Sequence, residues 1–181
     1  MKNVLSILLL FIAFSCGKAQ TKQEQEPPIK VEEKTSYYLI RHAEKDRTVD
    51  TNNPDLLKKG QERAQKWAEY FKTNGITFDA VYSTNYKRTK QTATPTAKQN
   101  KLDLIIYKPF KINLHEFKAK TKGQTVLIVG HSDTTPKFVN DLIGEDKYAP
   151  INDRVNSNLF VVTITGTEIT SELLNIEHYK L

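Results

Sequence analysis

The alternation of apolar runs along residues 36–181 predicts an α/β fold. Short runs, each suited to one buried strand, occur at 37–40, 79–83, 104–107, 125–129, 159–164 and 169–174. Continuous apolar strands that alternate with helices are typical of a sheet covered on both faces. We therefore expect a three-layer sandwich: a mainly parallel sheet flanked by helices, with the last two strands pairing antiparallel at the C-terminal end.

Helices are expected between these strands. The clearest one spans residues 58–72, where Ala64, Trp67 and Phe71 recur at three- and four-residue spacing and define one apolar face. Further helices are expected at 86–98, 114–120 and 136–143. The last of these is expected to stop at Gly144, because glycine is the residue typically found just past a helix C-terminus.

Residues 1–15 have the pattern of an export signal. Lys2 is followed by an almost unbroken apolar run over 4–14, shorter than the ~20 residues that a membrane-spanning helix needs. The segment 13–16 (AFSC) is similar to a bacterial lipobox, in which the peptidase cuts before the cysteine and the thiol carries diacylglycerol. We expect Cys16 to be lipidated, the alternative being an ordinary cleaved signal with an incidental cysteine. A single cysteine excludes an internal disulfide.

Composition divides the rest of the chain into a tether and a domain. Residues 16–35 contain almost no apolar side chains beyond Cys16, so this segment is expected to be a flexible tether. Residues 1–35 carry five Lys and four Glu, whereas residues 36–181 carry 22 Lys and Arg against 17 Asp and Glu. The basic excess of the domain can attract anionic ligands. No dense basic stretch with interleaved aromatic residues is present, so the sequence does not favour nucleic acid as a partner.

Polar residues follow three of the predicted strands directly. Arg41 and His42 come after the first strand, Ser83 to Arg88 after the second, and His131 after the fourth. In a parallel sheet, ligands bind beyond the carboxyl ends of the strands. These clusters are far apart in sequence, but we expect them to meet in space.

Two arginines and two histidines suit a phosphoryl group. A guanidinium binds phosphate oxygens in a bidentate way. A neutral imidazole can attack phosphorus to form a covalent intermediate, while the other cationic and imidazole groups stabilise charge on the equatorial oxygens. Such chemistry requires neither a metal nor another cofactor.

Three motifs together resemble those of the histidine phosphatase superfamily, which has the phosphoglycerate-mutase-like fold. They are RHAE at 41–44, YSTNYKRTKQTA at 82–93 and VGHS at 129–132, and they occur in the order of that family. The alanine after the first histidine is the residue usual in the small branch that is similar to phosphohistidine phosphatases. The resemblance covers about residues 36–164.

The resemblance implies a role for each matching residue. His42 would be the phosphorylated nucleophile, and Arg41, Arg88 and His131 would hold the phosphoryl group. Ser83, at the end of its strand, would shape the phosphate pocket.

The general acid that protonates the leaving oxygen is not fixed by these motifs. Glu116 lies between the second arginine and the second histidine, where larger family members carry a glutamate. Asp133 lies two residues after His131, one position later than the aspartate of the acid-phosphatase branch. Glu44 is a third candidate.

The sequence thus predicts a phosphomonoester hydrolase that acts through phosphohistidine at His42. The chain is short, so an open pocket is expected, and an open pocket favours water over a second substrate as the acceptor. A phosphoglycerate-mutase-type phosphotransferase and a non-catalytic phosphoryl-binding lipoprotein are the alternatives. The expected partner is a small phosphorylated substrate outside the cytoplasm, with membrane contact only through the lipid anchor, and no protein partner is inferred.

Overall fold

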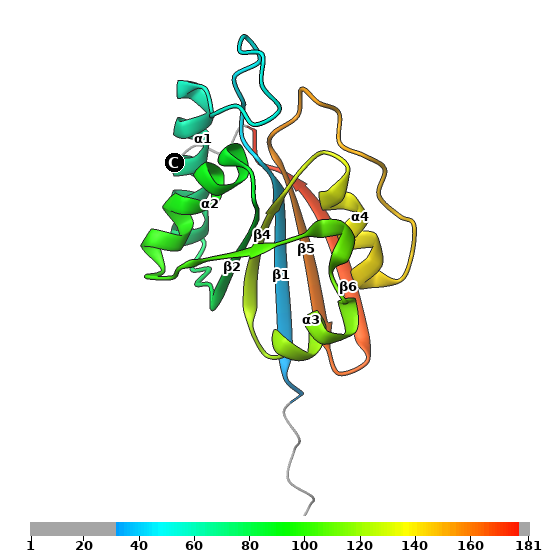
Figure 1. The fold of residues 1–181 in the computed structure, drawn as a ribbon. Helices are drawn as coiled ribbons and strands as arrows, with labels where there is room; N and C mark the ends of the chain where they lie inside the picture. The colour runs from blue at the N-terminus through cyan, green and yellow to red at the C-terminus, as the bar shows by residue number, and fades with distance from the viewer. Residues whose placement is uncertain (1–31, 178–181) are drawn as a thin grey trace, which may run out of the picture. The chain divides into compact units, whose positions relative to one another are not determined.

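Six strands form one mixed sheet in the computed structural model, which describes residues 32–177 (Figure 1). The strands are β1 (Lys34–Arg41), β2 (Ala80–Thr84), β3 (Leu104–Tyr107), β4 (Thr125–Gly130), β5 (Asn158–Thr165) and β6 (Glu168–Asn175). Their order across the sheet is β3-β2-β4-β1-β5-β6. The four strands from β3 to β1 are mutually parallel. β5 pairs antiparallel with β1, and β6 pairs antiparallel with β5. The fold class predicted from the apolar pattern is therefore confirmed.

The expected export signal and the expected lipidation site at Cys16 lie outside the described residues. Within residues 32–177, no helix is long and apolar enough to cross a membrane.

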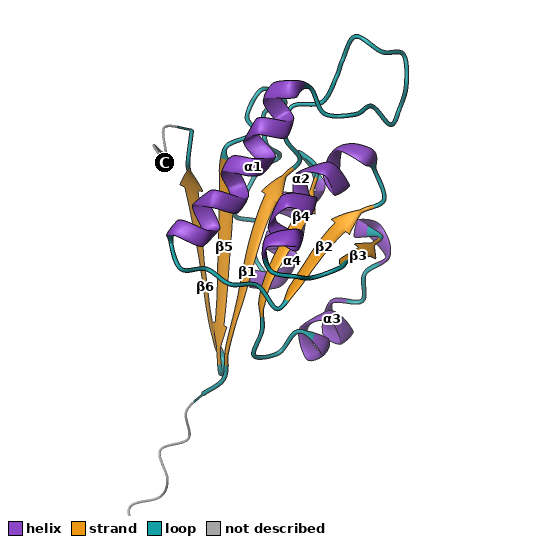
Figure 2. Cartoon of the chain, turned by 90° about the vertical axis from the view of Figure 1, so that its left-hand side faces the viewer, coloured by secondary structure: helices purple, strands orange, loops and turns teal. Residues whose placement is uncertain are grey.

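Helices cover both faces of the sheet (Figure 2). They are α1 (Lys58–Thr73), α2 (Lys87–Gln99), α3 (Leu114–Lys120) and α4 (Thr134–Ile143), with a 3-10 turn at Pro109–Lys111. Trp67 and Phe71 of α1 pack with α2 against one face of the sheet. Phe117 of α3 and Phe138 of α4 pack against the other face. β1, β2 and β4 are thus buried on both faces of the sheet, which explains their continuous apolar sequences, whereas the edge strand β3 leaves Ile106 exposed.

The observed boundaries differ from the expected ones by a few residues at most. The largest differences have local causes. β1 begins at Lys34 because the polar Thr35 and Ser36 pair with β5. α4 begins at Thr134 because the Asp133 carboxylate caps the helix by accepting a hydrogen bond of 2.8 Å from the Thr134 backbone N–H.

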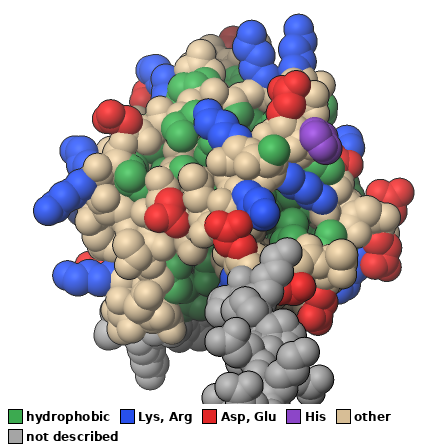
Figure 3. All heavy atoms as spheres, turned by 90° about the horizontal axis from the view of Figure 1, so that it is seen from below, with side chains coloured by type: hydrophobic (Ala, Val, Ile, Leu, Met, Phe, Trp, Pro, Cys, Tyr) green, Lys and Arg blue, Asp and Glu red, His purple; other side chains and the backbone are tan. Residues whose placement is uncertain are grey.

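Two long loops reach the end of the sheet that carries the carboxyl ends of the parallel strands, at the top of Figure 1. One is 42–57, between β1 and α1, and the other is 144–157, between α4 and β5. The opposite end of the domain carries the amino ends of the parallel strands, and its surface is seen in Figure 3, where basic, acidic and apolar side chains are interspersed. The strand topology therefore predicts that a ligand binds at the end of the sheet that carries the two loops.

Candidate active site

Three neighbouring strands bring the predicted clusters together. β4 lies between β1 and β2, and the backbone N–H of His42 donates to the Gly130 carbonyl over 3.0 Å. The rings of His42 and His131 lie 5.5 Å apart between centroids. The Nη2 of Arg88 lies 3.5 Å from Nδ1 of His131. Four residues from three separate sequence motifs thus form one cluster, since Arg41 directly precedes His42 at the end of β1.

Hydrogen bonds to the backbone fix the orientation of His42. Its Nδ1 lies 2.7 Å from the Ala43 carbonyl oxygen, which can only accept, so Nδ1 carries the proton and Nε2 has the lone pair. The Asn156 side-chain amide donates to the His42 carbonyl over 2.8 Å and ties it to the second loop. Burial, followed by the charges of Arg41 and Arg88, lowers the pKa of His42 to about 3. The imidazole is therefore neutral and nucleophilic at neutral pH.

His131 is also held as a neutral imidazole. Its Nε2 lies 2.9 Å from the Thr84 hydroxyl, which itself donates to the Thr89 hydroxyl. Because the Thr84 proton is used in this way, we infer that Nε2 of His131 donates to Thr84 and that Nδ1 faces Arg88 with its lone pair. Burial, with the positive charge of Arg88 next in importance, lowers the pKa of His131 to about 4.

The two arginines differ in how they are held. Arg41 is buried and donates through Nη1 to the backbone carbonyls of Asn152, at 3.2 Å, and Val155, at 3.0 Å, while Nη2 pairs with the Asp153 carboxylate. Among the described residues, Arg88 donates only to the Asn52 carbonyl, at 3.2 Å, besides its contact with His131. Within residues 32–177 the Nε of each arginine is buried without a hydrogen-bond partner. Burial lowers the pKa of both guanidinium groups, which remain cationic.

The resemblance places Ser83 at the phosphate pocket, but its hydroxyl is not available to bind a phosphate. Ser83 is fully buried, and its hydroxyl donates to the Thr84 carbonyl over 2.9 Å. A serine hydroxyl has one proton, so this bond leaves none for a phosphate oxygen. The hydroxyl that contacts the histidine cluster belongs to the next residue, Thr84, whose side chain points to the other face of the strand.

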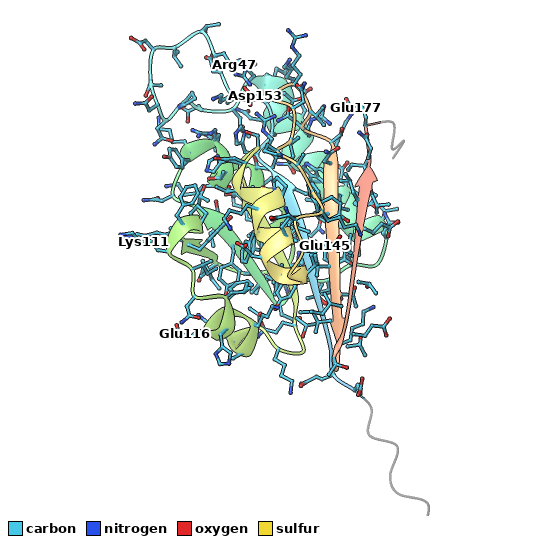
Figure 4. All side chains as sticks on the ribbon, turned by 90° about the vertical axis from the view of Figure 1, so that its right-hand side faces the viewer. Arg47, Lys111, Glu116, Glu145, Asp153 and Glu177 are labelled. Carbon is cyan, nitrogen blue, oxygen red and sulfur yellow. The ribbon has the colours of Figure 1, made fainter. Side chains whose placement is uncertain are left out.

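Glu116 is wrong as a general acid. It lies in α3, which leads into the start of β4, at the end of the sheet opposite to the histidines. Figure 4 shows Glu116 at the bottom of the domain and Arg47 and Asp153 at the top. Glu116 lies in the interval of the sequence that the resemblance indicates, but in the structure it lies at the amino end of the parallel strands, far from the histidines.

Glu44 and Asp133 both lie near the cluster. The two Glu44 oxygens accept from Nε of Arg63 in α1, at 2.9 and 3.0 Å, so the carboxylate is directed toward that helix. Asp133 follows the histidine motif directly and raises the proton affinity of His131 through its charge. Its exposed carboxylate is engaged only by the α4 backbone among the described residues. Asp133 therefore remains the best-placed candidate for the general acid.

Sequence reasoning did not find several residues of the site. Thr84 was within a quoted motif, and the alternation of faces along β2 could have distinguished it from Ser83. Tyr86 lies over Arg88, with 4.4 Å from the guanidinium carbon to the ring centroid, and contacts His131 edge to face. Asn156 has no signal in the sequence, because its role depends on how the 144–157 loop folds back onto β1.

The cluster is suited to phosphoryl transfer. It combines a neutral imidazole, two arginines and a second imidazole, and Arg41 and His42 also line an open cleft of about 490 Å³. Among residues 32–177 there is no group of three or more His, Cys, Asp or Glu side chains that could hold a metal ion. The donors present are cations and imidazoles, which match a tetrahedral dianion.

The fold and the site together define an α/β protein with an arginine- and histidine-lined cluster at the carboxyl ends of its parallel strands. The model of the histidine phosphatase superfamily (branch 1) matches residues 37–111, which include Arg41, His42 and Arg88. Over these residues the chain is similar to the histidine phosphatase superfamily. The enzyme class predicted from the motifs, a phosphatase of this type, is confirmed at that level. No curated protein sequence gives a significant match.

Solved structures share the fold at low sequence identity. The protein histidine phosphatase SixA complexed with tungstate is 15% identical, with a TM-score of 0.66 over 80% of this chain and 99% of that one. A phosphoserine phosphatase mutant from Entamoeba histolytica is 15% identical, with a TM-score of 0.61 over 81% and 100%. The alpha-ribazole phosphatase from Shigella flexneri is 16% identical, with a TM-score of 0.58 over 77% and 96%. At these identities the likeness concerns the fold alone.

Proposed function

We propose that the domain hydrolyses phosphomonoesters through a phosphohistidine intermediate on His42. The observation that carries the proposal is the Nδ1–H of His42 bound to the Ala43 carbonyl, which leaves the Nε2 lone pair free beside Arg88 and His131. A buried neutral imidazole with two neighbouring guanidinium groups is an activated nucleophile for a dianion.

The reaction has two steps. In the first, Nε2 of His42 attacks phosphorus, the bond from phosphorus to the leaving oxygen breaks, and that oxygen takes a proton. The positive charge that develops on the ring is stabilised by the Ala43 carbonyl, which already accepts from Nδ1. In the second step, water attacks phosphorus and gives a proton to the carboxylate that donated one in the first step, the phosphorus–nitrogen bond breaks, and His42 is regenerated. Arg41 and Arg88 stabilise the equatorial oxygens in both steps, and His131, whose Nδ1 lies against Nη2 of Arg88, holds that guanidinium in place.

Asp133 is proposed as the acid of the first step. Replacing Asp133 with Asn should lower kcat about 10²-fold or more for a poor leaving group such as an alkyl phosphate, and much less for a nitrophenyl ester, which needs no protonation. Glu116→Gln is the matched control, since Glu116 lies at the far end of the sheet and its replacement should change neither rate. If Asp133→Asn lowers kcat by the same factor for both esters, or for neither, another residue is the general acid.

Hydrolysis is favoured over transfer to a second substrate because the cleft beside His42 is open to solvent. Its volume of about 490 Å³ and its exposed rim would leave a phosphohistidine accessible to water. The location outside the cytoplasm is part of the proposal and rests on the signal-like residues 1–15 and on Cys16. The substrate is then a small phosphorylated molecule of the cell envelope or the exterior.

Trapping of the intermediate tests this function. The full chain is incubated with a ³²P-labelled activated phosphate ester and quenched in alkali, in which phosphohistidine survives. Wild type should incorporate label and His42→Ala should not, with Glu116→Gln as a control that incorporates label normally. Equal labelling of wild type and His42→Ala would contradict the covalent mechanism. Absence of label in both, together with phosphate binding, would favour the non-catalytic phosphoryl-binding protein.

A further inference from the structure

The cleft beside His42 has a chemistry of its own. Arg41 and His42 form its inner wall, and its outer walls come from the loops 42–57 and 144–157. The cleft therefore starts at the proposed phosphoryl position and leads outward between the two loops. A substrate whose phosphoryl group lies against His42 can place the rest of its structure only toward solvent, and this cleft is the hollow that adjoins His42 among the described pockets.

Basic side chains dominate the walls of this cleft. Besides Arg41, they are Lys45, Arg47, Lys59 and Arg154. The opposite end of the domain differs, because Figure 3 shows basic and acidic side chains interspersed there. A cleft whose walls carry an excess of positive charge concentrates anionic ligands.

The three carboxylates that line the same cleft are already engaged. Glu44 is held by Arg63, outside the cleft wall. Asp46 accepts from both the backbone N–H of Thr48, at 2.8 Å, and its hydroxyl, at 2.6 Å, and so closes a local turn. Asp153 is shared between Arg41 and Arg47.

Three of the cations are left without a carboxylate. In the described part of the chain, Lys45, Lys59 and Arg154 form no ion pair, although all three line the cleft. The contact of Asp153 with Arg41 and Arg47 also indicates that this wall accepts a carboxylate, with 2.7 Å between Nη2 of Arg47 and Oδ2 of Asp153.

Lys45 connects the cleft to the phosphoryl site. Its backbone pairs with Leu56 in an isolated antiparallel bridge, which closes the base of the 46–55 loop and fixes the position of Lys45. Burial lowers the pKa of Lys45, and the next cause is the charge of Arg88. Lys45 in turn lowers the pKa of His131, so its ammonium group lies within electrostatic reach of both arginine and histidine.

We propose that this cleft is the leaving-group subsite and that it selects phosphomonoesters whose leaving group carries a second anionic group, a carboxylate or a phosphate. The inference rests on the proposed function, because it takes His42 as the point of attack. Lys45, Lys59 and Arg154 would bind the second anion, while Arg41 and Arg88 hold the phosphoryl group.

A pair of esters of equal shape tests the subsite. The full chain is assayed with 4-carboxyphenyl phosphate and with 4-carbamoylphenyl phosphate, which differ by one charge. The charged ester should have a kcat/KM roughly 3- to 10-fold higher at low ionic strength, and the preference should shrink as salt screens the exposed cations. A third ester, 1,4-phenylene bisphosphate, distinguishes a second phosphate from a carboxylate.

Charge-removing variants assign the effect to the cleft. In Lys59→Gln/Arg154→Gln and in Lys45→Gln the ratio between charged and neutral ester should fall toward one. Lys98→Gln, an exposed lysine in the last turn of α2, is the matched control and should retain the wild-type ratio. A wild-type ratio of one or less for both charged esters would overturn the inference, as would a ratio that the cleft variants do not change.

A binding measurement separates this inference from the proposed function. In His42→Ala, calorimetry gives the Kd of each unreacted ester. Tighter binding of the charged esters in the absence of any turnover by wild type would reject the phosphatase and keep the anion subsite. Turnover by wild type without any preference in either assay would keep the phosphatase and reject the subsite.

Discussion

The proton arrangement around the two histidines is set by groups that do not themselves react. A backbone carbonyl fixes the tautomer of His42, and a threonine hydroxyl fixes that of His131. Both partners act through geometry, because a ring turned by a flip would present N–H where a lone pair is needed. Removing such a supporting hydrogen bond should therefore lower the rate of catalysis and not only the free energy of unfolding.

Thr84→Val tests the support of His131. The replacement keeps the shape but removes the oxygen that lies 2.9 Å from Nε2, so kcat/KM should fall roughly 3- to 10-fold, the value of one neutral hydrogen bond. Thr96→Val in α2 is the matched control, because the Thr96 hydroxyl is buried with no partner among the described residues. Equal steady-state rates of Thr84→Val and Thr96→Val would show that Thr84 does not position His131.

The lowered pKa values of the two histidines predict an acid-sensitive fold. In the unfolded chain each histidine takes a proton near pH 6.5, whereas in the folded chain His42 does so at about 3 and His131 at about 4. Between these values the unfolded state binds more protons, so the free energy of unfolding must fall as the pH falls. Each histidine should contribute a loss of about 2 kcal/mol between pH 7.5 and 5.

Urea unfolding at several pH values measures this loss. The Asp residues with lowered pKa values, such as Asp153, lose their stabilising effect only when the pH falls through the carboxylate range, so the interval above pH 5 isolates the histidines. His42→Asn and His131→Asn should each flatten the pH dependence by about half. A wild-type free energy of unfolding that stays constant from pH 7.5 to 5 would refute the neutral state of both rings.

At the scale of elements, periodicity in the sequence was sufficient for the sheet and its helices, because apolar spacing reports directly which side of an element is buried. It was not sufficient for the loops that complete the site. Asp153 and Asn156 lie in 144–157, a segment without periodicity, and their contacts depend on backbone carbonyls and on Arg41. The prediction of Glu116 as the acid was wrong for a related reason. Glu116 lies in the expected interval of the sequence, but α3 precedes β4 and so lies at the amino end of the parallel strands.

The walls of the cleft depend on the contact between α1 and the loop 42–57. Gly60 lies in the first turn of α1, where a Cβ atom would come within 2.3 Å of the Glu44 carbonyl oxygen. That carbonyl also accepts from the Leu57 backbone N–H at 2.9 Å, so the loop has little freedom to move away. Close packing of helix and loop backbones here therefore requires glycine.

Gly60→Ala is expected to destabilise the domain by about 1–3 kcal/mol, although alanine is the better helix former at an exposed position. Thermal unfolding measures the change. Gln61→Ala, at the next and exposed position of α1, is the control and should be neutral or slightly stabilising. If Gly60→Ala unfolds at the same temperature as Gln61→Ala or above it, the contact with Glu44 does not constrain the loop.

At the scale of the whole molecule, the site exists because three parallel strands, β1, β2 and β4, end at the same end of one sheet. Each motif is weak by itself, but parallel strands direct their carboxyl ends to that end of the sheet, and β2, β4 and β1 are neighbours. This is why Arg41, His42, Arg88 and His131 could be grouped from the sequence, while Thr84 and Asn156 could not. Grouping needs only the strand order, whereas the supporting contacts need side-chain and loop geometry.

The proposed position of this site outside the cytoplasm depends on the N-terminal segment and can be tested on the full chain. If the chain is cut before Cys16 and the thiol carries diacylglycerol, intact mass measurement of the mature protein should give a chain that starts at Cys16 with the added mass of the lipid. The wild-type protein should also partition into the detergent phase on Triton X-114 extraction, because two acyl chains anchor a protein stably to a membrane.

Cys16→Ser removes the only thiol of the chain and should abolish the lipid mass and shift the protein toward the aqueous phase. An uncleaved apolar run over 4–14 could also retain a variant in the detergent phase, so the mass decides and the partition supports it. Lys18→Gln, two residues further along the chain, is the matched control and should be lipidated like wild type. A wild-type protein cut elsewhere, or with an unmodified Cys16, would reject the anchor. Cleavage at another position would favour an ordinary secretory signal, whereas an uncleaved chain would contradict export.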